Sequence, residues 1–189
     1  MAIFKTFYYP YYLMSSEKID NEEILRLQTL KSYDILDTPK DGAFDRLTRI
    51  ASQFLNVPIA IISLVDEDRI WFKSIYGANI TEIERAPGLC ASAILVDGFY
   101  TVEHASVDPR TLTNPLIASE MGLEFYAAFP LKTSTGYNLG TFCILDKQPR
   151  HLEFFEIAFL KDLRDIVMDF MELKLQARTL VNSFEIEIN

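Results

Sequence analysis

The chain has 189 residues, which corresponds to one domain at the usual size of about 100–200 residues. Its composition is 49% hydrophobic and 13% aromatic, as expected for a well-packed globular protein. The net charge of −9 argues against nucleic acid and anionic membrane surfaces as partners, because both are bound through clustered Lys and Arg.

The first predicted elements are helical. Residues 1–18 are rich in aromatic side chains and are expected to form a flexible arm. Asp20 or Asn21 can cap a helix that runs to Lys31, and a second helix is predicted over 41–55 from its apolar spacing.

The next part of the chain predicts a hairpin. Residues 59–65 form a nearly continuous apolar run, which indicates a strand buried on both faces. Residues 70–76 alternate as a second strand, and a polar turn joins the two. A long connection over 77–88 and a short apolar helix over 89–95 follow.

A short strand is predicted over 100–104, then an irregular loop over 109–115 and a short helix over 117–121. A second hairpin is predicted from the strands 125–132 and 137–145. Because hairpins dominate, the sheet should be antiparallel and the fold class α+β. The helices at the two chain ends would cover one face, and loops and short helices the other.

From His151 onward the chain is predicted to be one long helix. Seven of its apolar positions are separated alternately by three and four residues, which is typical of a coiled-coil seam. The part beyond Lys174 should extend past the domain, and we expect it to pair with a second copy of the chain. The predicted dimerisation positions are Leu163, Ile166, Phe170, Leu173, Ala177, Leu180 and Phe184.

Motifs for catalysis are missing from the sequence: it contains no P-loop, dinucleotide fingerprint, His-Glu-x-x-His or Gly-x-Ser-x-Gly pattern. Cys90, His104 and Asp108 lack the spacing of a metal site, so no metal is expected. The longest uncharged apolar run, 57–65, is far shorter than the roughly 20 residues needed to span a bilayer, so no membrane insertion is expected. Without a signal peptide or a disulfide framework, the protein is expected to be cytoplasmic.

Cys90 allows two interpretations. Followed by Ser92 and with His104 further along, it could be a thiol nucleophile with a base nearby. The favoured interpretation is a small apolar residue on a short helix that faces the core, and Cys143 is interpreted as a core residue of its strand.

Two further groups could contact a ligand. Arg110 could pair with a ligand carboxylate, or with Asp108 in a loop that caps itself. Aromatic residues on the second and fourth predicted strands could line a pocket, although one alternate set must face the helices. The candidate ligand-binding residues are Trp71, Phe72, Cys90, Ser92, His104, Asp108, Arg110, Asn114, Tyr126 and Phe129.

Several segments occur in a characteristic combination. They are 33–39 with 44–48, 57–66 with Arg69 and 71–73, 90–91, 108–110 with 114–115, 125–127 with 130–131, and Gly136 with 139–146. Together they resemble the GAF domains of one large bacterial subfamily, and the resemblance covers about Tyr33 to Asp169.

The resemblance implies a six-stranded antiparallel sheet between helices, with terminal helices that often form a dimer bundle. Similar domains are input modules of sensor histidine kinases, response regulators, diguanylate cyclases and phosphodiesterases, so a kinase or cyclase output domain is a possible partner. Different GAF domains bind cyclic nucleotides, bilins, haem or small metabolites, which leaves the cofactor and the ligand unknown. No Cys-His pair is present at Cys90, which argues against a bilin chromophore.

These observations predict an arm over 1–18, a GAF domain over 19–170 and a helical extension over 171–189. The predicted function is a non-enzymatic sensory module of two-component signalling, homodimeric through its last helix and responsive to a small ligand or partner. Two alternatives remain open: a thiol-dependent redox enzyme of GAF fold that uses Cys90, and a ligand-free structural dimerisation domain.

Overall fold

A computed structural model describes residues 16–86, 88–111 and 122–188 of the chain. The expected aromatic arm, up to residue 15, and the helix expected over 117–121 lie outside these residues. The described elements, in chain order, are α1 (Ser16–Ser32), α2 (Gly42–Leu55), β1 (Ile59–Val65), β2 (Arg69–Tyr76), β3 (Glu82–Glu84), α3 (Leu89–Ala93), β4 (Tyr100–Val102), β5 (Phe125–Lys132), β6 (Asn138–Asp146) and α5 (Phe154–Ile188).

The sheet is antiparallel and has six strands in the order β3-β2-β1-β6-β5-β4, which confirms the predicted α+β class. Both predicted hairpins are present, as the pairs β1–β2 and β5–β6, and β1 is buried along its whole length between β2 and β6. β3 lies inside the stretch that was predicted to be only a connection. It has three residues and pairs with the outer side of β2.

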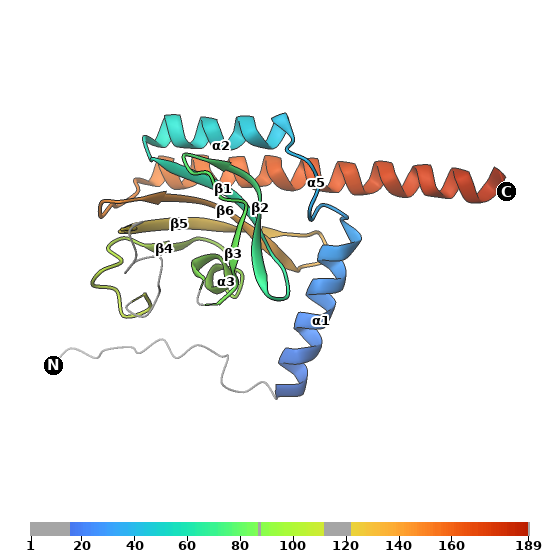
Figure 1. Ribbon diagram of the computed structural model, residues 1–189, viewed down its shortest axis with the longest axis horizontal. Helices are drawn as coiled ribbons and strands as arrows, with labels where there is room; N and C mark the ends of the chain where they lie inside the picture. Colours follow the sequence, from blue (N-terminus) through green and yellow to red (C-terminus); the bar gives the residue numbers. More distant parts are fainter. Residues whose placement is uncertain (1–15, 87, 112–121, 189) are drawn as a thin grey trace.

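The two faces of the sheet are covered differently. α2 and α5 lie side by side on one face and α3 lies on the other, while α1 runs at a steep angle to α5 at one end of the sheet (Figure 1). Each face has its own apolar core. Phe44 and Phe142 belong to the core under α2 and α5, and Tyr126 and Cys143 belong to the core on the α3 side.

α2 begins and ends where the sequence provides capping residues. The Asp41 carboxylate accepts a hydrogen bond of 3.0 Å from the backbone N–H of Ala43, as an N-cap does. Asn56 ends the helix in the left-handed conformation, with φ at +50°, and its backbone N–H donates to the Ser52 carbonyl. The predicted helix over 41–55 is therefore confirmed.

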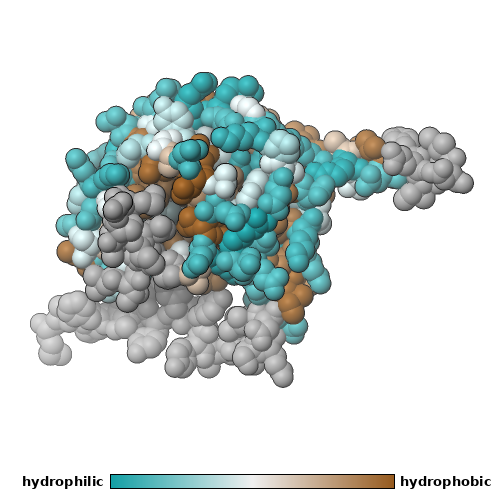
Figure 2. Space-filling model, viewed as in Figure 1, coloured by the Kyte–Doolittle hydropathy of each residue, from teal (hydrophilic) through white to brown (hydrophobic). Residues whose placement is uncertain are grey.

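α5 has 35 residues, which corresponds to a length of about 52 Å at 1.5 Å per residue. Leu160, Leu163, Val167 and Met171 of this helix are buried in the core. Beyond them the helix leaves the body of the molecule as a projecting rod (Figures 1 and 2).

Candidate functional site

A cluster of thiols and hydroxyls lies on the α3 face of the sheet. α3 places Cys90 beneath β6, where its Sγ is 4.0 Å from the Sγ of Cys143. The Tyr126 hydroxyl donates a hydrogen bond of 3.3 Å to Cys90 Sγ. The hydroxyls of Ser63 and Thr141 are 2.8 Å apart in the same cluster. The pairing of a thiol from a helix with a thiol from a strand is a contact that the sequence did not predict.

The environment separates the acidities of the two thiols. Hydrogen bonds from Cys143 and from the Ser63, Tyr126 and Thr141 hydroxyls lower the pKa of Cys90 to about 6, although burial opposes this. Burial raises the pKa of Cys143 well above its ordinary value, and so does the neighbouring Cys90. The arrangement thus favours a thiolate at Cys90 and a protonated donor at Cys143.

The cavity beside this cluster is small and apolar. Its volume is about 30 Å³, which is room for roughly one water molecule. Phe72 and Tyr126, two of the predicted ligand residues, line it together with Cys90. A ligand of metabolite size therefore does not fit in this cavity in the conformation described.

Two predicted aromatic residues lie on the opposite face. Trp71 and Phe129 are buried in the core under α2 and α5, and the ring of Phe129 is 5.2 Å from that of Phe99. Strand alternation separates them from Phe72 and Tyr126, as anticipated for positions that are one or three residues apart on the same strand. The predicted aromatic residues therefore do not form one shared pocket.

Arg110 and Asp108 lie at a shallow surface hollow and bind each other. The guanidinium of Arg110 donates to both carboxylate oxygens of Asp108, at 2.5 Å and 3.0 Å, and to the carbonyl of Thr101 at 2.8 Å. These hydrogen bonds lower the pKa of Asp108. The backbone N–H of Arg110 also donates to Asp108, so the loop caps itself, which is the alternative to ligand binding that the sequence left open.

The remaining predicted ligand residues are not assembled around Cys90. His104 lines the same surface hollow, half-exposed, with its Nε2 3.7 Å from a Glu124 oxygen. The Ser92 hydroxyl donates to the carbonyl of Gly88 in the first turn of α3. Asn114 lies outside the described residues. His104 is therefore not the base that a Cys90 nucleophile would need at hydrogen-bond distance.

Two negative observations apply to the described part of the chain only. Among residues 16–86, 88–111 and 122–188 there is no group of three His, Cys, Asp or Glu side chains placed to hold a metal ion. None of the helices described combines the length and the apolar character needed to cross a bilayer.

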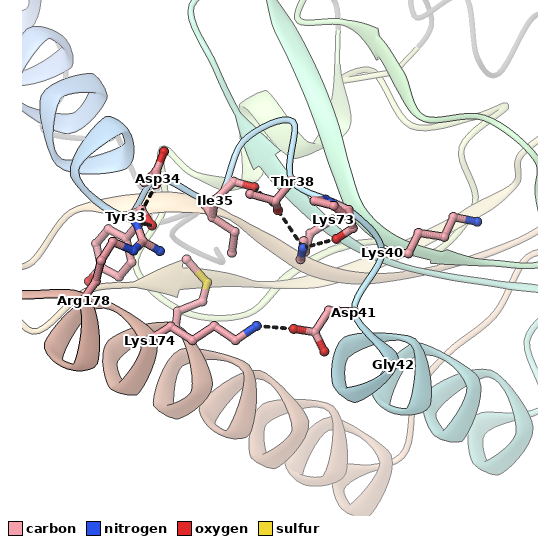
Figure 3. A pocket seen from close by; sticks show the side chains of 12 residues that line it. Tyr33, Asp34, Ile35, Thr38, Lys40, Asp41, Gly42, Lys73, Lys174 and Arg178 are labelled. Carbon is pink, nitrogen blue, oxygen red and sulfur yellow. Dashed lines mark hydrogen bonds and ion pairs between the residues drawn. The ribbon is translucent and has the colours of Figure 1, made fainter. Parts of the chain in front are cut away.

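A cavity of metabolite size lies on the helical face, where no site was predicted. Its volume is about 420 Å³, and it is enclosed by residues 33–42, by Lys73 of β2 and by α5 (Figure 3). Two signals in the sequence pointed toward it. The segment 33–39 is part of the family resemblance, and Lys73 is the charged residue within the run 70–75, whose other members are uncharged.

The predicted seam of α5 divides into buried and exposed positions. Leu163 is 5% exposed in the core, so its assignment to a dimer seam is corrected: the domain itself covers this residue. Phe170 is half-buried, with its ring 6.2 Å from that of Phe44. Ala177 is exposed, and the side chain of Phe184 lies outside the described part. The large exposed positions of the predicted seam are Ile166, Leu173 and Leu180.

A six-stranded antiparallel sheet between α2, α5 and α3 is the α+β architecture to which the motifs pointed. Residues 40–168, more than half of the chain, match the sequence model of the GAF domain family. The chain belongs to the GAF domain family.

Known proteins resemble the chain over most of its length. A cyclic di-GMP phosphodiesterase of Pseudomonas aeruginosa is 33% identical over 156 residues, which cover 82% of this chain and 27% of that protein. The chain thus spans about a quarter of that relative.

Two solved structures share the fold at lower identity. The GAF domain of an Acinetobacter phosphoenolpyruvate-protein phosphotransferase has a TM-score of 0.59 at 18% identity, over 84% of this chain and 95% of that one. A free methionine-R-sulfoxide reductase from Neisseria meningitidis has a TM-score of 0.60 at 16% identity, over 87% and 96%. These similarities concern the fold alone.

Proposed function

We propose that the chain is a regulatory GAF module of bacterial signal transduction, and that it acts as a homodimer through α5. The observation that carries this proposal is a row of exposed apolar side chains on one face of the helix, the exposed stripe, which the exposed Asp162 interrupts between Phe155 and Ile166. Phe155, Ile166, Leu173 and Leu180 are between 39% and 61% exposed. At 100° per residue they lie within about 40° of the helix circumference, so they share one face.

The stripe continues onto α2. The ring of Phe54, which is 56% exposed, lies 4.1 Å from that of Phe159 on α5, and Ile50 is exposed one turn before Phe54. A connected exposed apolar surface of this kind is unusual for a monomer and is typical of an interaction site. A second copy of the same helix supplies a matching apolar surface, which makes a symmetric pairing the simplest occupant.

The relationship to a much longer relative supports the regulatory part of the proposal. The phosphodiesterase of Pseudomonas aeruginosa contains far more sequence than this chain can match. We therefore place the chain as an input module whose helix α5 reports to an output domain, either a phosphodiesterase, a cyclase or a kinase. A shift in the pairing or rotation of α5 would transmit the signal if a ligand binds two dimer states with different affinity.

The test is Leu173→Glu, which places a charge in the centre of the stripe. The unmodified chain should sediment as a dimer in analytical ultracentrifugation, and the variant should dissociate at a concentration at least about tenfold higher, because burying an unpaired carboxylate is costly. Asn182→Glu is the matched control, since position 182 lies on the opposite side of the same helix and is also exposed. A monomeric parent protein, or equal weakening by both variants, would contradict the proposal.

The thiol cluster supports a second candidate function, a thiol-dependent reductase. Cys90 and Cys143 are close enough to form a disulfide after a small movement, since their sulfur atoms are 4.0 Å apart. In such a reaction the two thiols would reduce a sulfoxide to a thioether, forming one disulfide and releasing the oxygen as water. This candidate requires a Cys90 thiolate near neutral pH, and it fails if Cys90 stays protonated there.

The small cavity on the α3 face favours, for that face, the ligand-free structural dimerisation domain. Phe72 and Tyr126 line this cavity, and its volume is only about 30 Å³. If a ligand regulates this chain, it must either open the α3 face or bind elsewhere.

A further inference from the structure

Lys73 is a buried ammonium that the fold directs into the large cavity. β1 and β2 pair Ile62 with Ser74 and Ser63 with Phe72, so Lys73 is the extra residue of a β-bulge. As a result Lys73 and Ser74 both point to the helical face, where Ser74 Oγ donates to Asp45. Lys73 instead reaches into the cavity (Figure 3).

The immediate partners of Lys73 are neutral. Its Nζ donates to the Thr38 hydroxyl at 2.7 Å and to the Pro39 carbonyl at 2.8 Å. The residue is 4% exposed, and burial followed by repulsion from Lys174 lowers its pKa, although the nearby carboxylates of Asp41 and Asp45 oppose this shift. A buried positive charge held by neutral oxygens is stabilised by any anion that approaches it.

α5 supplies two more cations to the same cavity. Lys174 lies one turn after Met171 and forms an ion pair with Asp41. Its Nζ is 5.0 Å from the centre of the Phe44 ring, and the Nζ of Lys73 is 5.7 Å from that centre, so both ammonium groups flank one ring. Arg178, one turn further, pairs with Asp34 at 3.1 Å.

The wall is therefore electropositive in a strongly acidic protein. Four basic residues line the cavity against two carboxylates, whereas the whole chain has a net charge of −9. Lys40 is one of the four, and its side chain points away from Lys73 in Figure 3. The three others, Lys73, Lys174 and Arg178, come from opposite walls.

We propose that this cavity binds a small organic anion, a phosphate ester or a carboxylate, between residues 33–42 and α5. The volume of about 420 Å³ lies within the usual range for metabolite sites, roughly 300–1,000 Å³. The anionic group accepts a hydrogen bond from Lys73 and competes with Asp41 for Lys174. This site lies on the face of the sheet opposite to Cys90, and its existence does not depend on dimerisation of α5.

The location gives the ligand direct contact with the helix that leaves the domain. Tyr33 donates to Glu172 at 2.7 Å, and Arg178 donates to the Tyr33 carbonyl at 2.8 Å, so the cavity wall is already tied to α5. The ion pair of Lys174 with Asp41 is a further tie between this wall and α5, and an anion that releases Lys174 removes it. This coupling, unlike binding itself, rests on the proposed signalling role.

Sodium pyrophosphate and sodium citrate are suitable probes, because they represent the two anion classes. Their affinity for the full chain is measured by isothermal titration calorimetry at constant ionic strength adjusted with NaCl. Binding of either probe should weaken about tenfold or more in Lys73→Met and in Lys174→Gln, as expected for loss of a charged hydrogen bond. The probe that binds identifies the class.

Lys161→Gln is the matched control. Lys161 lies on α5 about 19 Å before Lys174 along the helix, and it pairs at the surface with Asp165. Its removal should leave the affinity within about twofold of the parent. Since Lys174 is half-exposed, its variant should fold even if Lys73→Met does not. Absence of binding by both probes, or equal losses in Lys174→Gln and Lys161→Gln, would overturn the proposal.

Discussion

The ionisation of Cys90 is the prediction that separates a reactive thiol from an inert core residue. Its pKa of about 6 arises from donors, with the Cys143 thiol first among them, and it falls below the ordinary value of 9.0 despite burial. At pH 7 a pKa of about 6 corresponds to roughly ten thiolates for each thiol. Replacing Cys143 by Ala removes the leading donor, so the pKa of Cys90 should rise in that variant.

The expected contribution of Cys90 to stability follows from the same pKa values. A pKa lowered from 9.0 to about 6 represents about a thousandfold change in the acid constant, or at most about 4 kcal/mol of preference for the thiolate in the folded protein. Between pH 6 and 9 the unfolded chain then binds more protons than the folded one, so stability should rise with pH. Above pH 9 the raised pKa of Cys143 reverses the sign, and stability should fall.

Two measurements test the lowered pKa of Cys90 and its effect on stability. Thiolate absorbance at 240 nm, followed from pH 4 to 10 with the fold monitored by circular dichroism, should show a transition near pH 6 that is absent in Cys90→Ala. Urea unfolding over the same pH range should show the rise in stability in the parent and its loss in Cys90→Ala. An absorbance transition only above pH 8 in the parent, or an unchanged midpoint in Cys143→Ala, would refute the assigned role of the donors.

Two further predictions concern the packing of the central strands and the ion pair at the anion cavity. Gly140→Ala should lower the unfolding free energy by about 3 kcal/mol or more in urea titrations, because the added Cβ would lie 1.9 Å from the Ser63 carbonyl oxygen on the neighbouring central strand. Gly42→Ala, whose added Cβ would meet only the Arg46 guanidinium at an ordinary contact distance of 3.9 Å, should cost less than about 0.5 kcal/mol, and similar losses in both variants would refute the steric argument. Asp41→Asn keeps a capping side chain but loses the ion pair with Lys174, so it should cost about 0.5–1 kcal/mol at pH 7. Hydrogen bonds from Lys174 and the backbone lower the pKa of Asp41, so this contribution is present above pH 4 and is lost as the pH falls through the lowered pKa. A difference from the parent that does not shrink as the pH is lowered below 4 would contradict its electrostatic origin.

The sequence predicted those elements that are long and periodic. The strand over 59–65 agrees with β1 at both ends, and the helix over 41–55 agrees with α2 because Asp41 and Asn56 mark its limits. β3 was missed because three residues at a sheet edge, mostly exposed, carry no readable alternation.

The cavity was harder to predict because its walls come from segments that are distant in the sequence. Alternation from Trp71 assigns Lys73 to the helical face, but no local pattern indicates that residues 33–42 and α5 lie against it. The β-bulge brings Ser74 to the same face. The contact of Cys90 with Cys143 joins residues 53 positions apart, which no local pattern encodes. The pairing of Arg110 with Asp108, by contrast, is local and was among the predicted alternatives.

α5 illustrates why spacing alone did not locate the dimer seam. Intervals of three and four residues occur in the stripe that the domain covers, Leu160, Leu163, Val167 and Met171. The exposed residues Ile166, Leu173 and Leu180 are seven residues apart, and the predicted seam joined the two sets because Leu163 and Ile166 are three apart. Arg178 is the most C-terminal residue for which the described structure shows a bond to the rest of the domain. The exposed stripe continues past Arg178 to Leu180, so the proposed dimer surface and the anion cavity adjoin at one turn of α5. A change in the contacts of Arg178 or Lys174 with the domain therefore acts at the point where α5 leaves the domain toward its proposed partner.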